Sequence, residues 1–282
     1  NQLFCAHNRG ALLINENKTV TTLDNNGYWN FKLIPSNPNF IIGANYSGLS
    51  IFEKTTKGWK YRNQLKGYDK STNVIEIDKN RVWFKKGEFV YKLKLSDDLK
   101  KINIEKKYKN INNTGKYIES IRYLKNSIYF IADNHFYKYY EEDDAFYEDK
   151  KTTALFKNVP KIRSLREDDQ GNIWYLFSES LGALMKDKKG NYKNVVAPFT
   201  NLTGNLVYQY ESVYTIDNNI FIGLTDGLAH YDATLISNRI TKPKAYLRSF
   251  SFPKDTLFLG NMPQPLKEYA IPYKSNNVIF TF

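Results

Sequence analysis

The chain has 282 residues, of which 41% are hydrophobic and 16% aromatic, and a formal net charge of +12. This composition supports a packed core and excludes a disordered protein, while the single cysteine excludes an internal disulfide. No run of eighteen apolar residues occurs, so we expect no membrane helix inside the chain. The lysines are scattered and alternate with acids, so we expect no nucleic-acid binding through this segment.

A β-strand pattern recurs along the chain at spacings of 37 to 47 residues. Its most regular copy runs from Ile162 to Tyr192, where strand-like runs alternate with turns at Asp168–Gly171 and near Gly182. The second strand of each copy gives an anchor residue, and the six anchors are Phe4, Ile41, Val82, Ile128, Ile173 and Ile220. Spacings of this size are typical of propeller blades, in which four short strands and their turns take about 40–45 residues.

The copies also agree in chemistry around the anchor. A polar turn, often with Asn, precedes it, and a bulky side chain such as Trp83 or Trp174 follows it in most copies. Five copies carry a glycine that we assign to the next turn, and these are Gly10, Gly48, Gly87, Gly182 and Gly227. The fourth copy has Asn134-His135 instead. Asn and Gly tolerate the backbone of tight hairpins, so each copy predicts antiparallel strands.

These observations predict an all-β fold, a β-propeller of four-stranded blades over residues 1–239. Unrelated hairpins in a sandwich or barrel are the alternative. The first copy begins at its second strand, and the last stops after Leu228–Tyr231. We therefore expect the missing strands, and a further blade that brings the full ring to seven, to lie upstream of Asn1.

The pattern changes after about Ile240. Residues 240–282 predict a strand over Thr241–Phe252, a loop over Lys254–Lys267 and a strand over Val278–Phe282. We interpret them as the start of a second domain, an immunoglobulin-like β-sandwich that the chain does not finish.

The repeats resemble a known family. The segment Ile162 to Trp174, with Leu181-Gly-Ala-Leu184, resembles the two-component regulator propeller repeat, and Asn219–Asp232 is similar to the same repeat. The tail, above all Asn276–Phe282, looks like the start of the triple-tyrosine domain that follows such propellers. The resemblance implies the periplasmic sensor part of a bacterial histidine kinase, hybrid kinase or related regulator. It also implies a homodimer in the full-length protein and a membrane helix outside this segment.

No catalytic or metal-binding constellation is evident in the sequence. His7, His135 and His230 fall at different offsets from their anchors and outside metal-ligand spacings. Asp168-Asp169 is placed as a turn, and Glu141–Asp144 lacks the glycine and spacing of a calcium loop. We expect no cofactor and no enzymatic activity in this segment.

Ligand binding is the stronger hypothesis. In a propeller, the turn between the second and third strands and the link into each first strand open on one face, around the central channel. Candidate ligand-binding residues on these segments are Arg9, Trp29, Tyr46, Lys86, His135, Glu179, Tyr210 and Asp226. Aromatic rings beside polar groups suit a small polar ligand such as an oligosaccharide. The expected function is carbohydrate sensing for a two-component system; a glycan lyase or hydrolase, or a protein-interaction scaffold, are the alternatives.

Overall fold

The computed structural model describes residues 2–208, 211–234, 247–253, 255–258 and 270–281. The chain divides into two compact units, Asn1–Ile236 and Ser237–Phe282, and each is described by itself. The predicted boundary between residues 239 and 240 falls in the segment 235–246, which lies outside the described residues.

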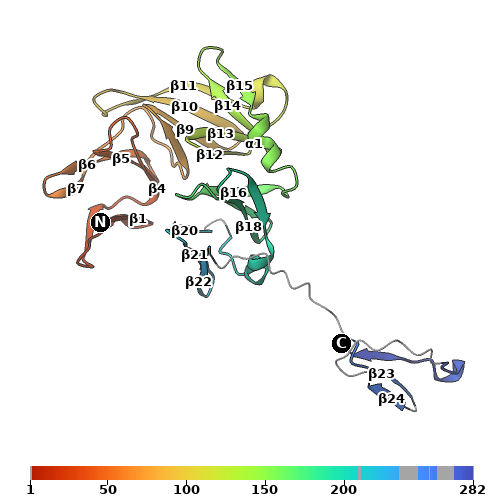
Figure 1. Ribbon diagram of the computed structural model, residues 1–282. Helices are drawn as coiled ribbons and strands as arrows, with labels where there is room; N and C mark the ends of the chain where they lie inside the picture. The colour runs from red at the N-terminus through yellow and green to blue at the C-terminus, as the bar shows by residue number, and fades with distance from the viewer. Residues whose placement is uncertain (1, 209–210, 235–246, 254, 259–269, 282) are drawn as a thin grey trace. The chain divides into compact units, whose positions relative to one another are not determined.

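The first unit is a β-propeller. Its six antiparallel sheets, here called blades 1 to 6, follow one another around a ring (Figure 1). Within each blade the strands pair in sequence order, so every connection between neighbours is a hairpin. Blades 2 to 5 have four strands, and blades 1 and 6 have three among the described residues.

The strands of the blades have the following bounds. Blade 1 contains β1 (Leu3–His7), β2 (Gly10–Ile14) and β3 (Val20–Asp24), and blade 2 contains β4 (Tyr28–Leu33), β5 (Phe40–Asn45), β6 (Gly48–Thr55) and β7 (Gly58–Gln64). Blade 3 contains β8 (Ile75–Asp78), β9 (Arg81–Lys86), β10 (Phe89–Leu95) and β11 (Ile102–Tyr108). Blade 4 contains β12 (Ser120–Leu124), β13 (Ser127–Ala132), β14 (His135–Tyr140) and β15 (Ala145–Glu148). Blade 5 contains β16 (Ile162–Glu167), β17 (Ile173–Phe177), β18 (Ser180–Lys186) and β19 (Tyr192–Val195), and blade 6 contains β20 (Val213–Ile216), β21 (Asn219–Leu224) and β22 (Gly227–Asp232).

The predicted propeller is confirmed, and all six anchors lie on equivalent strands. Ile173, for example, lies on β17 and pairs with Glu167 on β16 and Leu184 on β18. The five later anchors lie on the second strand of their blades, and Phe4 lies on β1, the first of the three described strands of blade 1. Unrelated hairpins in a sandwich or barrel are therefore excluded for this unit.

Both faces of blade 5 are buried, because one packs against blade 4 and the other against blade 6. On β17, Ile173 contributes to a core shared with blade 4, while the next residue, Trp174, contributes to a core shared with blade 6. Both side chains are buried. Side chains alternate between the two faces of a strand, so a continuous apolar run is what a blade strand requires.

One predicted turn glycine was wrong. Gly182 lies within β18, and the turn between β17 and β18 instead bears Ser178, whose φ is +46°. A Cβ on Gly182 would lie 2.3 Å from Cζ of Tyr175, its partner on β17. The glycine is therefore required by the ring packed over it rather than by a turn.

The few helical segments connect blades. They are η1 (Ile111–Asn113), α1 (Lys150–Leu155) and η2 (Ala197–Leu202). Asp149 caps α1, because its side chain accepts a hydrogen bond from the backbone N–H of Thr152. Across the described part of the chain, no helix combines the length and apolar character needed to cross a membrane.

The second unit contains one antiparallel sheet, in the order β24-β23-β25, with β23 (Ser249–Phe252), β24 (Asp255–Phe258) and β25 (Ile279–Thr281). A short helical turn, η3 (Tyr273–Ser275), precedes β25. The predicted loop over 254–267 is wrong at Asp255–Phe258, which forms a strand because it folds back on β23 as a hairpin. The predicted strand over 278–282 is confirmed as β25, and that over 241–252 begins only at Ser249 within the described residues. A second layer of a sandwich is not seen in these described residues.

Candidate ligand site in the central cavity

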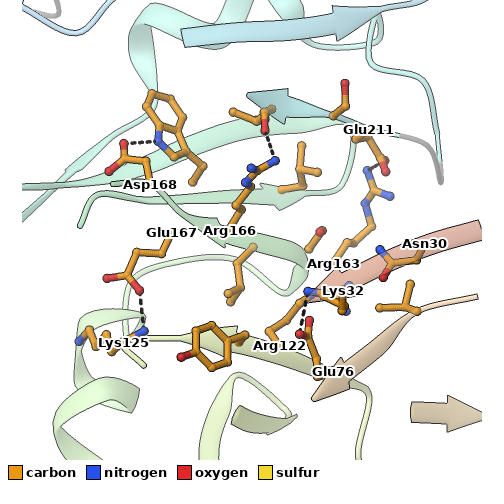
Figure 2. A pocket seen from close by; sticks show the side chains of 18 of the residues that line it. Asn30, Lys32, Glu76, Arg122, Lys125, Arg163, Arg166, Glu167, Asp168 and Glu211 are labelled. Atoms are coloured by element: carbon orange, nitrogen blue, oxygen red, sulfur yellow. Dashed lines mark hydrogen bonds and ion pairs between the residues drawn. The ribbon is translucent and has the colours of Figure 1, made fainter. Parts of the chain in front are cut away.

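The first strands of successive blades surround a central cavity of about 1440 Å³ (Figure 2). Its walls come from β4, β8, β12, β16 and β20, from residues just before β8 and β20, from the turns after β12 and β16, and from side chains of β17 and β18. A cavity of this volume exceeds the usual range for small-molecule sites, so it can hold a ligand of several sugar units.

Two ion pairs join neighbouring blades across this cavity. Nζ of Lys32 on β4 lies 2.8 Å from Oε2 of Glu76 on β8, and Nη2 of Arg163 on β16 lies 2.6 Å from Oε1 of Glu211. Both carboxylates are largely buried, each with 7% of the side chain exposed. Buried carboxylates require such partners, so these pairs fix the side chains that line the wall.

Two further guanidinium groups line the cavity without a carboxylate partner of this kind. Arg122 on β12 donates from Nη1 to the carbonyl oxygen of Ile121 at 2.8 Å, and Arg166 on β16 donates from Nη1 to that of Val213 at 2.9 Å. Among the described residues, no carboxylate lies within ion-pair distance of either group. Burial lowers the pKa of Arg122, and the nearby charge of Glu76 only partly opposes this effect.

The acidic turn after β16 has a structural role. Asp168 accepts hydrogen bonds from the backbone N–H of Gln170 and Asn172, and from Nε1 of Trp174 at 2.9 Å. Glu167 accepts from the backbone N–H of Lys125 at 2.5 Å, which ties blade 5 to blade 4. Figure 2 shows both carboxylates engaged with these partners beside the cavity.

Three of the sequence-predicted residues come together at the edge of the cavity. Trp29 lines the cavity, and its ring centroid lies 4.9 Å from that of Tyr46. Nε1 of Trp29 donates to Oγ of Ser71 at 3.2 Å, and Nζ of Lys86 donates to the carbonyl oxygen of the same serine at 2.9 Å. Trp29 and Tyr46 are 40% and 41% exposed, so their rings remain available to a ligand. We call Trp29, Tyr46, Ser71 and Lys86 the aromatic edge.

The ring of Tyr46 can occupy its position because the residue packed against it, Gly27, has no side chain. A Cβ on Gly27 would lie 2.5 Å from Cε2 of Tyr46, so the ring packs directly on the backbone of the link that enters β4. The turn between the second and third strands and this link are therefore neighbours, as predicted from the propeller geometry. Blade 5 repeats the arrangement, since Arg163 donates from Nε to the carbonyl oxygen of Ser178.

The other predicted site residues do not join this group. Arg9, Glu179 and Asp226 are exposed in the turns of blades 1, 5 and 6. His135 is bound within blade 4, with its Nδ1 2.8 Å from Oε1 of Glu148. Tyr210 lies outside the described residues. None of these four described residues lines the central cavity.

A second charged cluster lies away from the cavity, between blades 3 and 4. Nζ of the buried Lys92 contacts both carboxylate oxygens of Glu141 at 2.8 Å and the hydroxyl of Tyr139 at 3.1 Å. Asp144 accepts from Tyr108 and Tyr139 and pairs with Lys106. The two ends of the acidic run Glu141–Asp144 are thus neutralised by side chains of blade 3. Within the described ranges, no group of His, Cys, Asp and Glu has the arrangement of a metal site.

The charges that line the cavity were missed from the sequence. Lys32, Glu76, Arg122 and Arg166 lie on the first strands, whereas the prediction considered only turns and links. A signal was present, because a charged residue within an otherwise apolar first strand, as in Ile75-Glu-Ile77, is unexpected unless the strand faces an aqueous channel.

Comparison with known proteins identifies the fold. No protein-family model matches the chain, and no curated protein does so. Among solved structures, two crystal structures from B. thetaiotaomicron are similar, one described as the extracellular domain of a one component system and the other as that of a hybrid two component system. They give TM-scores of 0.55 and 0.53, each at 13% identity over 84% of this chain.

The chain spans only 34% of each of those structures. A structure from Bacteroides fragilis described as a 6-phosphogluconolactonase is also similar, with a TM-score of 0.52 at 12% identity, covering 82% of this chain and 77% of that one. At these identities the likeness shows the propeller fold alone.

Proposed function

We propose that the chain is the extracytoplasmic ligand-sensing part of a bacterial two-component signalling protein, and that it binds a carbohydrate or related polar ligand without chemical turnover. The observation that carries the proposal is the exposed Trp29–Tyr46 pair at the edge of a large polar cavity. Flat rings beside hydrogen-bonding groups suit the apolar face and hydroxyl groups of a sugar ring.

Two other observations support the sensing role. The repeats from Ile162 and from Asn219 resemble the two-component regulator propeller repeat, and extracellular domains described as parts of one- and two-component systems share the fold. The periplasm would then be the location. Binding would be passed through the triple-tyrosine sandwich to a dimeric kinase or regulator beyond this segment.

A glycan lyase or hydrolase is the second candidate, favoured by the lactonase-like structure that shares the fold. Hydrolysis requires an acid and a base positioned beside the sugar. In the cavity Glu76 and Glu211 are each held in an ion pair, Glu167 and Asp168 accept hydrogen bonds from N–H groups, and Asp169 lies in an exposed turn. No histidine is among the described residues that line the wall. The geometry therefore favours binding over turnover. An interaction scaffold remains a third candidate, which predicts that proteins rather than sugars stabilise the chain.

The test is a thermal-shift screen of the purified chain with neutral and acidic oligosaccharides, followed by calorimetric titration of those that raise Tm. We expect one sugar class to bind, and Trp29→Ala to weaken it about tenfold or more, because the loss of an aromatic anchor from a binding site costs about 2 kcal/mol. Tyr147→Ala, which removes an exposed ring on β15 outside the cavity lining, is the matched control. Release of sugar fragments, or stabilisation by a partner protein alone, would contradict the proposal.

A further inference from the structure

Charges of both signs line the central cavity, and among the described residues two of its arginines have no carboxylate partner. The cationic side chains of the lining are Lys32, Arg122, Lys125, Arg163, Arg166 and Lys186, and its carboxylates are Glu76, Glu167, Asp168, Asp169 and Glu211. Glu76 and Glu211 form the ion pairs with Lys32 and Arg163, while Glu167 and Asp168 accept hydrogen bonds from N–H groups. Arg122 and Arg166 are then left with main-chain carbonyl oxygens as their hydrogen-bond acceptors in the described structure.

The two arginines come from adjacent blades and line the same cavity. β12 and β16 pack beside each other, and Figure 2 shows Arg122 beside Lys32 and Glu76, with Arg166 on the next strand. Each guanidinium uses Nη1 for its carbonyl, and no hydrogen bond from Nε or Nη2 is seen within the described residues. A guanidinium offers a planar fork of donors that matches a carboxylate, and partial enclosure strengthens such a contact.

The groups beside the arginines restrict the class of ligand further. Oδ1 of Asn30, which also lines the cavity, is buried and has no hydrogen-bond donor within the described residues. It is suited to accept a hydrogen bond from a ligand hydroxyl. The residue before Asn30 on β4 is Trp29 of the aromatic edge, so a ring, a hydroxyl and a carboxylate could be recognised by the lining of one cavity.

We propose that the cavity binds a carboxylate-bearing sugar, of the uronic-acid class, with its carboxylate on Arg122 and Arg166. The inference names the ligand class for the proposed sensing role and rests on it. The two arginines attract the acid, while the aromatic edge and Asn30 distinguish a hydroxylated ring from a simple inorganic anion.

The experiment is isothermal titration of the purified chain with sodium glucuronate, glucose and sodium sulfate at constant ionic strength. We expect glucuronate to bind about tenfold or more tightly than glucose or sulfate, which each offer only part of the recognised chemistry. Arg122→Gln and Arg166→Gln should each weaken glucuronate about tenfold or more. Arg62→Gln removes the same charge from β7, where the guanidinium lies over Phe40, and should leave the affinity unchanged.

A variant that is expected to raise the affinity shows that the losses in the Gln variants do not come from misfolding. Glu76→Gln removes a carboxylate beside Arg122 and releases Lys32, so it should tighten glucuronate binding severalfold. Arg122→Lys and Arg166→Lys keep the charge and lose the planar fork of donors. Their affinities for glucuronate should lie between those of the wild type and the Gln variants.

The outcomes separate the two proposals. Neutral sugars that bind through Trp29 with no effect of either Gln variant would overturn the acid site and leave the sensing role intact. Sulfate that binds as tightly as glucuronate would overturn the uronic-acid assignment. Failure of any acidic or neutral sugar to bind would overturn both.

Discussion

At the scale of single residues, a glycine is hardest to replace where an aromatic ring packs directly against its backbone. Gly182 and Gly227 were predicted to have the same role, yet they differ in surroundings. The position of a Cβ on Gly182 overlaps the ring of Tyr175, while a Cβ on Gly227 would meet nothing within 4 Å. Neither has a positive φ, so the comparison isolates packing from backbone strain.

Gly182→Ala should therefore destabilise the propeller by about 1–3 kcal/mol, the usual cost of overpacking a core, with Gly227→Ala close to neutral. Urea unfolding followed by tryptophan fluorescence measures both. Equal stability of the two variants would show that the Tyr175 ring can move aside, and would contradict the assigned role of Gly182.

The same scale shows where sequence reasoning succeeds. Asp168 could be placed in a turn because Asp-Asp-Gln-Gly favours one, and its hydrogen bonds to backbone N–H groups and to Trp174 agree with that placement. Trp29 and Tyr46 were predicted to bind ligand, which stays a prediction, but their rings do contact each other. The pairing of Lys32 with Glu76, 44 residues apart, could not be predicted, because it depends on how two blades are rotated against each other.

At the scale of elements, blades 3 and 4 are joined by the buried side chain of Lys92. Hydrogen bonds from Lys92 to Glu141 and Tyr139 raise its pKa against the opposing effect of burial. Arg81 reinforces the joint at 3.1 Å from the same carboxylate. Lys94, two residues along β10, is exposed and makes no ion pair in the described structure.

We expect Lys92→Met to lower the free energy of unfolding by about 1–3 kcal/mol, because Glu141 and Tyr139 lose a hydrogen-bond donor. The loss is smaller than for a fully buried ion pair, because the side chain of Glu141 is 48% exposed. Lys94→Met is the matched control. In a double-mutant cycle with Glu141→Gln, a coupling energy near zero would show that the contact does not hold the blades together.

The helix between blades 4 and 5 predicts a pH dependence. Burial alone would raise the pKa of Asp149, but hydrogen bonds from Thr152 and Tyr129 outweigh it and lower the pKa from 3.8 to about 2. A depressed carboxyl pKa contributes stability above its unfolded value, and this contribution is lost as pH falls from about 4 toward 2. The contribution at neutral pH is about 2 kcal/mol.

Asp149→Asn should accordingly lose about 2 kcal/mol at pH 7 and show a shallower fall in stability between pH 4 and pH 2 than the wild type. Asp169→Asn, in an exposed turn, is the control. Urea midpoints across this pH range provide the measurement, and parallel curves for Asp149→Asn and the wild type would rule out the assigned role.

At the scale of the whole molecule, repetition made the architecture predictable. Six apolar anchors at blade-like spacing leave few folds that bury both faces of every sheet. The tail was less predictable, because the hairpin strand Asp255–Phe258 lies among residues that also favour a loop, and strand formation there depends on pairing with β23. The cavity could not be predicted from the sequence, because its walls combine residues from five blades.

The most direct test of the account is a crystal structure of the chain grown with an aldobiouronic acid, a uronic acid linked to a neutral sugar. The account predicts an intact disaccharide in the central cavity, with its carboxylate on Arg122 and Arg166 and a sugar ring against Trp29. A cleaved sugar, or a disaccharide bound only on the outer strands of the blades, would contradict it.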